Sequence, residues 1–102
     1  MTHYEQIEII KRQIVEKVDP EQIFLFGSCA KGVIRKNSDI DLCIIKETEQ
    51  LRKFKLDLEL SLDSDIPLDI IAYTPESWAK NSEDPTSFAY LIKHKGVMIY
   101  GR

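Results

Sequence analysis

The sequence predicts an α/β fold in which a small mixed sheet of three or four strands is flanked by helices. Short runs of β-branched and aromatic residues alternate with longer segments whose apolar residues recur every three or four positions. Their order is helix, strand, strand, helix, strand, helix, helix and a short apolar tail, which gives too few strands for a doubly wound sheet. A chain of 102 residues, 43% of them hydrophobic, can bury one core. We therefore expect one hydrophobic core and one domain over residues 1–102.

The first half of the chain predicts a helix followed by two buried strands. From about Glu5 to Val18, apolar residues recur on one stripe of a helix with charged and amide side chains opposite, and Asp19-Pro20 ends that helix. The runs Ile23 to Phe26 and Ile40 to Ile45 are short and almost entirely apolar. Such runs are typical of strands in the centre of a sheet.

A second helix is expected between Thr48 and Leu62, before a third strand. The main apolar stripe of this helix leaves Leu56 and Leu60 on another side. The helix therefore carries apolar residues around its girth and is able to pack on two sides. The apolar run Leu68 to Tyr73 then predicts the third strand.

The C-terminal part predicts two further helices and a tail. Thr74 as N-cap and Pro75 at the first helical position mark the start of one helix. The last helix is expected from Thr86 or Ser87 to Lys93, and Gly96 is expected to end it in the left-handed conformation. The apolar residues 97–100 follow as a tail.

The composition excludes several classes of protein. A formal charge of −3 argues against a general nucleic-acid binder, which usually carries a basic stripe. No apolar run is long enough to span a bilayer, so we expect a soluble protein with no membrane partner. Cys29 and Cys43 have no metal-ligand spacing and no secretory leader precedes them. They are therefore predicted to be free thiols in the cytoplasm.

A glycine turn after the first strand is the first part of a candidate site. Gly27 lets the backbone turn sharply and lets a phosphate approach its N–H groups, and Ser28 adds a hydroxyl donor. Lys31 lies within the turn and is placed to bind the outer phosphates of a nucleoside triphosphate. Arg35 and Lys36 are as consistent with a solvated loop as with phosphate contact.

Three carboxylates form the second part of the candidate site. Because strand side chains alternate, Asp39 and Asp41 are expected on one face with their backbones about 7 Å apart. Such a pair is usually accommodated by a raised pKa or by hard divalent cations. Asp69 lies within the apolar third strand, where a buried unpaired charge would be costly, whereas Asp63 and Asp65 lie in the polar loop before it. The alternative for Asp69 is a carboxylate on an edge strand that faces solvent. A metal site shared by Asp39, Asp41 and Asp69 would explain all three.

These two parts together resemble a known family. Gly27-Ser28, followed eleven residues later by Asp39-x-Asp41 and then by a strand carboxylate, resembles the pattern of the DNA polymerase beta-like nucleotidyltransferase superfamily. The short chain is most similar to the minimal nucleotidyltransferases, which are often encoded beside a HEPN-domain protein. The segment from Ile23 to Tyr73 carries the resemblance, which implies the polymerase beta-like nucleotidyltransferase fold.

The resemblance also implies roles for the matching residues. Ser28 would hold the triphosphate, and Gly27 would give it access to the backbone. Asp39, Asp41 and Asp69 would be the catalytic residues and the ligands of two Mg²⁺ ions about 3.5–4 Å apart. Asp69 would hold the catalytic ion and help to deprotonate the attacking hydroxyl.

The implied reaction transfers a nucleoside monophosphate, AMP from ATP, to a hydroxyl group and releases pyrophosphate. The implied acceptor is a HEPN-type toxin, which would make this chain the antitoxin. Many minimal members carry arginine where Cys29 stands, so triphosphate binding is expected to differ here. Two alternatives stay open, namely a module that neutralises its partner by contact alone and an enzyme that modifies a small molecule such as an aminoglycoside. An oligomer is also left open.

Several other side chains receive no role in the candidate site. His3 is predicted to be a surface residue, and His94 to be a cation at a helix C-terminus. Four aromatic residues near the end of the chain are predicted to belong to the core rather than to a base-binding site. They are Trp78, Phe88, Tyr90 and Tyr100.

Overall fold

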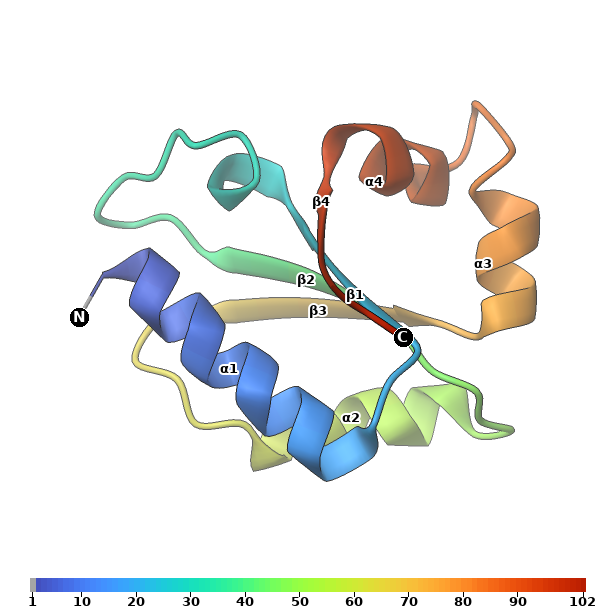
Figure 1. Cartoon of the computed structure of the whole chain (residues 1–102), viewed down its shortest axis with the longest axis horizontal. Helices are drawn as coiled ribbons and strands as arrows, with labels where there is room; N and C mark the ends of the chain where they lie inside the picture. Colours follow the sequence, from blue (N-terminus) through green and yellow to red (C-terminus); the bar gives the residue numbers. More distant parts are fainter. Residues whose placement is uncertain (1) are drawn as a thin grey trace.

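The computed structural model describes residues 2–102, which form four helices and one four-stranded sheet (Figure 1). This arrangement confirms the predicted α/β class with a small mixed sheet. The elements are α1 (His3–Val18), β1 (Gln22–Phe26), the single 3-10 turn η1 (Gly27–Cys29), β2 (Ile40–Ile45), α2 (Leu51–Ser61), β3 (Leu68–Tyr73), α3 (Pro75–Asn81), α4 (Phe88–Lys95) and β4 (Val97–Gly101).

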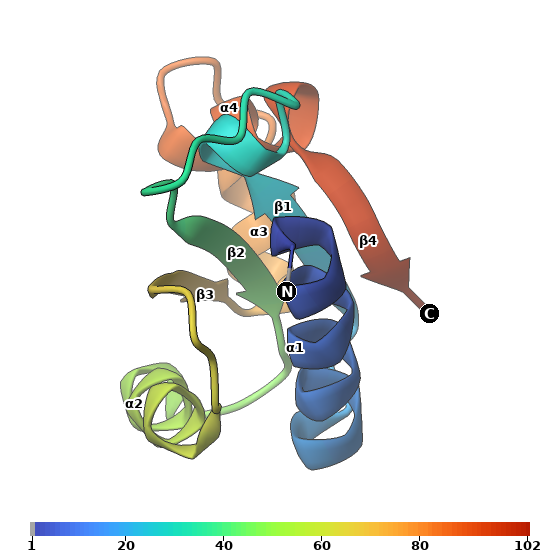
Figure 2. The ribbon, with the colours of Figure 1, turned by 90° about the vertical axis from the view of Figure 1, so that its left-hand side faces the viewer.

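The sheet has the strand order β3-β2-β1-β4, with β3 and β4 at its two edges (Figure 2). β1 pairs antiparallel with both β2 and β4, whereas β2 and β3 are parallel and are connected through α2. A parallel pair needs such a crossover because the chain must return to the starting end of the sheet.

The predicted tail is in fact the edge strand β4. It pairs with β1, so that Ile23 lies opposite Tyr100 and Leu25 opposite Val97. Arg102 follows β4, and its ion pair with the Asp19 carboxylate holds it beside the start of β1. Strand formation here depends on a partner more than 70 residues away in the sequence, which local residue patterns do not show.

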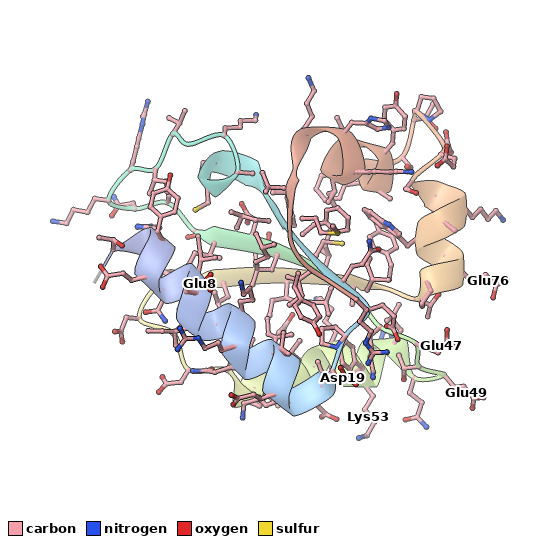
Figure 3. The ribbon with its side chains drawn as sticks, in the orientation of Figure 1. Glu8, Asp19, Glu47, Glu49, Lys53 and Glu76 are labelled. Atoms are coloured by element: carbon pink, nitrogen blue, oxygen red, sulfur yellow. The ribbon has the colours of Figure 1, made fainter. Side chains whose placement is uncertain are left out.

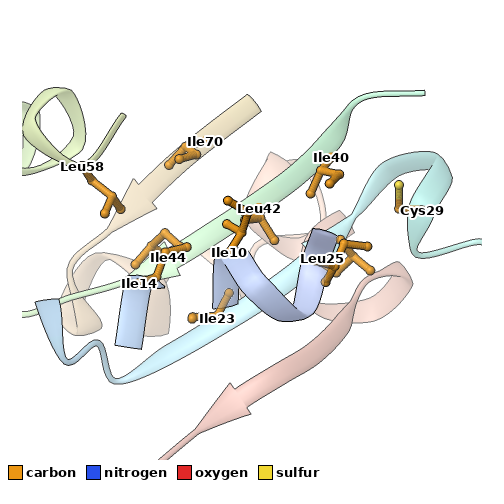
Figure 4. Packing of buried hydrophobic residues seen from close by; sticks show 11 residues of the cluster. Ile10, Ile14, Ile23, Leu25, Cys29, Ile40, Leu42, Ile44, Leu58 and Ile70 are labelled. Atoms are coloured by element: carbon orange, nitrogen blue, oxygen red, sulfur yellow. The ribbon is translucent and has the colours of Figure 1, made fainter. Parts of the chain in front are cut away.

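The helices cover the two faces of the sheet in pairs (Figure 1). α1 and α2 bury one face, where Ile10 and Ile14 pack with Ile40, Leu42 and Ile44. Figure 4 shows this cluster, with Cys29 at one end and with Leu58 and Ile70 toward the other. α3 and α4 bury the opposite face, against Phe24, Cys43 and Ile45. Because alternate β2 residues go to each face, Asp41 lies on the face of α3 and α4.

Side-chain caps determine where three of the helices begin. Thr2 and Glu5 form a reciprocal capping box, so α1 begins two residues before the predicted start. The Thr74 hydroxyl accepts from the Ser77 backbone N–H at 3.2 Å, with proline at the start of α3 as predicted. The Ser87 hydroxyl accepts from the Tyr90 N–H at 3.1 Å and begins α4.

Gly96 ends α4, but not in the left-handed conformation that we predicted. Its φ is −84° and its ψ is 179°, which is ordinary extended backbone. A Cβ atom at this position would lie 2.5 Å from the Ile92 carbonyl oxygen and 2.8 Å from that of Leu25. Glycine is therefore required by the close approach of α4 to β1, rather than by an unusual dihedral angle.

Both cysteines are buried free thiols, as predicted. Burial raises the pKa of Cys43 to about 12, so this thiol stays protonated in the core. Trp78 is also buried, as predicted, and its ring lies 4.9 Å from that of Phe24 and 5.5 Å from that of Tyr73. Of the helices within residues 2–102, none has the length and apolar character needed to cross a membrane.

Candidate active site

One row of residues across the sheet forms the floor of the candidate site. In the strand register, Phe26 at the end of β1 lies opposite Asp41, and Asp41 lies opposite Asp69 of β3. Side chains at paired positions point to the same face. All three therefore point to the face that α3 and α4 cover, so the two carboxylates are neighbours although 28 residues separate them in the sequence.

The glycine turn lies directly against this row. Gly27 has a φ of +72°, and its carbonyl oxygen accepts from the N–H groups of Ala30 (3.2 Å) and Lys31 (3.3 Å). A Cβ atom at Gly27 would collide with a carboxylate oxygen of Asp41. The sequence pattern explained this glycine by the approach of a phosphate. The structure adds a second reason, because only glycine leaves room for the Asp41 side chain.

A pocket of about 530 Å³ opens over the row and the turn. This volume lies within the usual range for small-molecule sites. Of the residues proposed from the sequence, the pocket brings together Gly27, Lys31, Asp41 and Asp69. Its other lining residues, none of which was proposed from the sequence, are Phe26, Phe88, Leu91, Ile92 and Lys95.

Asp39 and Ser28 lie next to the pocket but do not line it. Asp39 is exposed and comes immediately before β2, while Ser28 is half-buried within η1. The Asp39 carbonyl oxygen accepts a hydrogen bond from the Cys29 thiol at 3.4 Å. One residue earlier, the Ser38 carbonyl oxygen lies 2.8 Å from Nε2 of His3. Two contacts therefore fix the backbone that leads to Asp39, and sequence reasoning gave neither side chain this role.

Cys29, where the resemblance found in the sequence leads us to expect arginine, is 3% exposed. Burial, and then the nearby Asp41 carboxylate, raise the pKa of the Cys29 thiol. The thiol therefore remains protonated at neutral pH and can donate to Asp39. This buried position fits the interpretation of a small residue that fills a tight turn. A thiol carries no positive charge, so Cys29 cannot replace the arginine as a cation for a phosphate.

The carboxylates of the row repel one another, and this repulsion affects the pKa of Asp41. Burial is the main cause that raises the pKa of Asp41, and the charges of Asp69 and Asp39 raise it further. Within residues 2–102, no three histidine, cysteine, aspartate or glutamate side chains are grouped closely enough to hold a metal ion by themselves. The donor chemistry nevertheless fits Mg²⁺, since carboxylate oxygens are its preferred protein ligands and its charge would offset this repulsion.

The wall of the pocket formed by α4 was not predicted from the sequence. Phe88 is 52% exposed and Leu91 50% exposed, and both face the pocket rather than the core. The prediction that Phe88 belongs to the core was therefore wrong. Lys95, in the last turn of α4, adds a second cation to the pocket beside Lys31. The apolar period of a helix shows that one side is apolar, but not whether that side meets the core or a pocket.

The remaining charged residues considered from the sequence lie outside this pocket. Arg35 and Lys36 are exposed in the connector between η1 and β2 and do not line it. Asp63 and Asp65 are exposed in the loop before β3. His94 lies at the C-terminal end of α4, with its ring 4.0 Å from that of Tyr90, which agrees with the predicted position at a helix terminus.

Three comparisons with known proteins agree with this geometry. Residues 8–102 match the protein family described as polymerase beta, nucleotidyltransferase. The Haemophilus influenzae protein named Probable protein adenylyltransferase MntA is 34% identical over 99 residues, which cover 93% of this chain and 79% of that protein. A crystal structure from Sulfolobus solfataricus, of a protein described as a nucleotidyltransferase, has a TM-score of 0.62 at 21% identity. That match covers 97% of this chain and 86% of the other.

The family match spans nearly the whole chain, and it includes the glycine turn, the row of carboxylates and the α4 wall. The structural match shows the same fold in a chain of low sequence identity. Both agree with the resemblance found in the sequence. The chain therefore belongs to the polymerase beta family of nucleotidyltransferases, and it is a nucleotidyltransferase.

Proposed function

We propose that this protein uses Mg²⁺ to transfer AMP from ATP to a hydroxyl group on a partner protein. The observation that carries this proposal is the register row, which places Asp41 and Asp69 in one pocket with the Gly27 turn and two lysines. A 34% identical relative is named as a protein adenylyltransferase, which supports AMP as the transferred group and a protein as the acceptor.

The proposed partner is a HEPN-type toxin, with this chain as its antitoxin in the cytoplasm. This part of the proposal rests on the resemblance to minimal nucleotidyltransferases and on the MntA relative. A pocket that is open at the surface also suits an acceptor supplied by another protein. Asp69, for example, is an exposed residue on an edge strand.

The nucleotide side of the reaction is assigned to the glycine turn and the two lysines. The backbone at Gly27 and the Ser28 hydroxyl would bind the triphosphate, and Lys31 and Lys95 would neutralise its charge. Asp39, Asp41 and Asp69 would hold two Mg²⁺ ions. When bound, these ions would stabilise the negative charge on the α-phosphate and on the leaving pyrophosphate.

The transfer itself is an in-line displacement at the α-phosphorus. The acceptor oxygen forms a bond to this phosphorus, and the bond to the oxygen that bridges to the β-phosphate breaks. The bonding electron pair leaves with pyrophosphate. We assign the proton of the acceptor hydroxyl to the Asp69 carboxylate, because this side chain is in the row with Asp41 and is also exposed to an incoming protein.

One experiment tests the proposal directly. The protein is incubated with α-labelled ATP, Mg²⁺ and the product of the adjacent gene, as the proposed HEPN-type partner, and the label on that partner is measured. We expect labelling by the wild type and none by the double variant Asp39→Asn, Asp41→Asn. Labelling that survives in the double variant would contradict the mechanism. A partner that is bound and inhibited by the wild type without any label would show instead a module that acts by contact alone.

A separate prediction concerns Lys95, which only the structure identifies as part of the pocket. Lys95→Ala should raise the KM for ATP roughly 10- to 100-fold, because a charge-assisted contact to phosphate is worth about 1.5–3 kcal/mol. Folding stability should change little, since Lys95 is exposed. The matched control is Lys80→Ala on α3, an exposed lysine that does not line this pocket. Equal KM values for ATP in the two variants would show that Lys95 does not bind the nucleotide.

A further inference from the structure

The edge strand β3 has backbone groups that no other described strand pairs with. β3 is the last strand of the sheet, next to β2 alone. The carbonyl oxygens of Pro67 and Tyr73 accept from β2, at 3.0 Å from the Ile40 nitrogen and 2.9 Å from the Lys46 nitrogen. The N–H and C=O of one residue point to the same side of a strand, and this side alternates along it. Leu68, Ile70 and Ala72 therefore direct their backbone groups outward.

A hollow of about 410 Å³ lies beside this edge, and it shares Asp69 with the nucleotide pocket. It is bounded by the end of α2, by the loop before β3 and by the first residues of β3. Asp69 is the one residue that lines both the hollow and the pocket. A group that reaches Asp69 from the hollow would meet the nucleotide site from the side opposite the α4 wall.

A second, more apolar hollow continues along the same edge toward the other end of α2. Ala72 of β3 lines it together with four residues of α2, namely Leu51, Arg52, Lys55 and Leu56. Its two cations mean that basic side chains are expected only beside the first hollow. Leu56, which the sequence placed off the main apolar stripe, is 52% exposed at this hollow. The outward backbone groups of β3 are thus flanked by α2 along most of their length. An added strand would find apolar surface as well as hydrogen-bonding partners there.

The charges of the two sites differ in sign and indicate which ligand each one takes. Two lysines, Lys31 and Lys95, line the nucleotide pocket. The residues that line the hollow include Glu59 and Asp69 but no lysine or arginine. Lys55 forms an ion pair with Glu59 at 3.0 Å, yet the exposed Asp63 and Asp65 keep this region negative. A triphosphate is repelled from such a hollow, whereas a basic protein segment is attracted to it.

From these observations we infer that the hollow beside β3 binds the acceptor protein through an extended, basic segment, which adds to β3 as a fifth strand. This inference rests on the proposed transfer to a protein hydroxyl. Because side chains alternate along a strand, the residue opposite Asp69 faces the nucleotide, while its two neighbours face α2. The geometry therefore assigns the hydroxyl to that residue and basic side chains to the positions immediately before and after it.

The first test reverses charge at the hollow. The variant Glu59→Lys, Asp65→Lys should raise the KM for the proposed HEPN-type partner roughly tenfold and leave the KM for ATP unchanged. The matched control is the double variant Glu47→Lys, Glu49→Lys, which also reverses two exposed charges but in the segment before α2 (Figure 3). A wild-type KM for the partner in the double variant would overturn the inference and leave the proposed function intact. A wild type that labels no protein would overturn both.

The second test does not depend on any variant. Hydrogen exchange of the wild-type protein is measured with and without the HEPN-domain partner. Pairing at the edge should slow exchange of the Leu68 and Ile70 amides by at least roughly tenfold, because both N–H groups would become hydrogen-bonded. Protection confined to α1, α3 or α4, with unchanged exchange in β3, would show that the partner docks elsewhere.

Discussion

Replacement of Asp41 by asparagine should lower nucleotide transfer on the order of 10³-fold and, at neutral pH, leave the protein at least as stable as the wild type. The loss of activity follows from removing a charge that helps to organise the site for the transition state, an effect that commonly reaches this size. The unchanged or higher stability follows from the surroundings of Asp41. Its charge is partly buried beside the carboxylates of Asp69 and Asp39, and asparagine has the same shape without the charge.

The effect on stability should depend on pH in a defined direction. The pKa of Asp41 is raised in the folded protein above its ordinary value of 3.8. The folded state therefore binds more protons than the unfolded state between these two values, and stability falls as the pH rises through the raised pKa. Asparagine avoids this loss. Its advantage should be largest at pH 7 and should shrink as the pH falls toward the ordinary value.

Thermal unfolding in EDTA measures this difference without interference from bound divalent ions. Melting temperatures of the wild type and of Asp41→Asn would be compared from pH 7 to pH 4.5, with Asp57→Asn as control. Asp57 is an exposed residue on α2 whose ion pair with Lys53 is worth little. An asparagine variant that melts well below the wild type at pH 7 would show that the Asp41 carboxylate stabilises the fold, contrary to this account.

The second large effect is expected for Gly27→Ala. A methyl group there meets two obstacles, the positive φ of +72° and the carboxylate of Asp41. The first costs about 1–2 kcal/mol in any L-residue. The second displaces the Asp41 side chain from the row that it forms with Phe26 and Asp69. If Asp41 has the proposed role, a displacement of about 1 Å is expected to cost about 100-fold in rate. We therefore expect the variant to lose both stability and about 100-fold in transfer activity.

Gly32→Ala separates these two effects. Gly32 has nearly the same dihedral angle, with a φ of +75°, but a Cβ atom there would meet nothing within 4 Å. This variant should lose about 1–2 kcal/mol in the free energy of unfolding and keep its transfer activity within about twofold. Chemical denaturation and initial rates of labelling check both values. If the two alanine variants lose activity equally, contact with Asp41 is not the reason for glycine at position 27.

The sequence was most informative where a local signal is sufficient. β2 and β3 have the predicted bounds, because each is a short apolar run between polar loops, and α3 begins at the predicted cap. β4 was predicted only as a tail, since its partner β1 lies more than 70 residues away in the sequence. Gly96 was correctly placed at the end of the helix but for the wrong reason, because a close approach between backbones leaves no mark in the sequence.

In the candidate site, too, local patterns predicted the strand and turn residues but not the residues that distant packing brings in. Gly27, Lys31, Asp41 and Asp69 line one pocket. The alternation of strand residues was enough to place Asp41 on the face opposite Ile40 and Leu42, whereas Asp69 was proposed from the cost of an unpaired charge in an apolar strand. The α4 residues that close the pocket could not be predicted in the same way. Their position depends on how a helix 60 residues beyond the glycine turn packs over the sheet.

The row formed by Phe26, Asp41 and Asp69 also limits how this chain can vary in length. A shift of β3 by one residue against β2 would send Asp69 to the face of α1 and α2 and would turn Ile70 toward the nucleotide. A single insertion or deletion inside either strand would therefore replace a carboxylate of the row by a neighbouring leucine or isoleucine, even if the sheet still formed. Length changes between Ser61 and Leu68 leave the register intact. We therefore expect length changes in the loop before β3 to preserve activity, and length changes within β3 to abolish it.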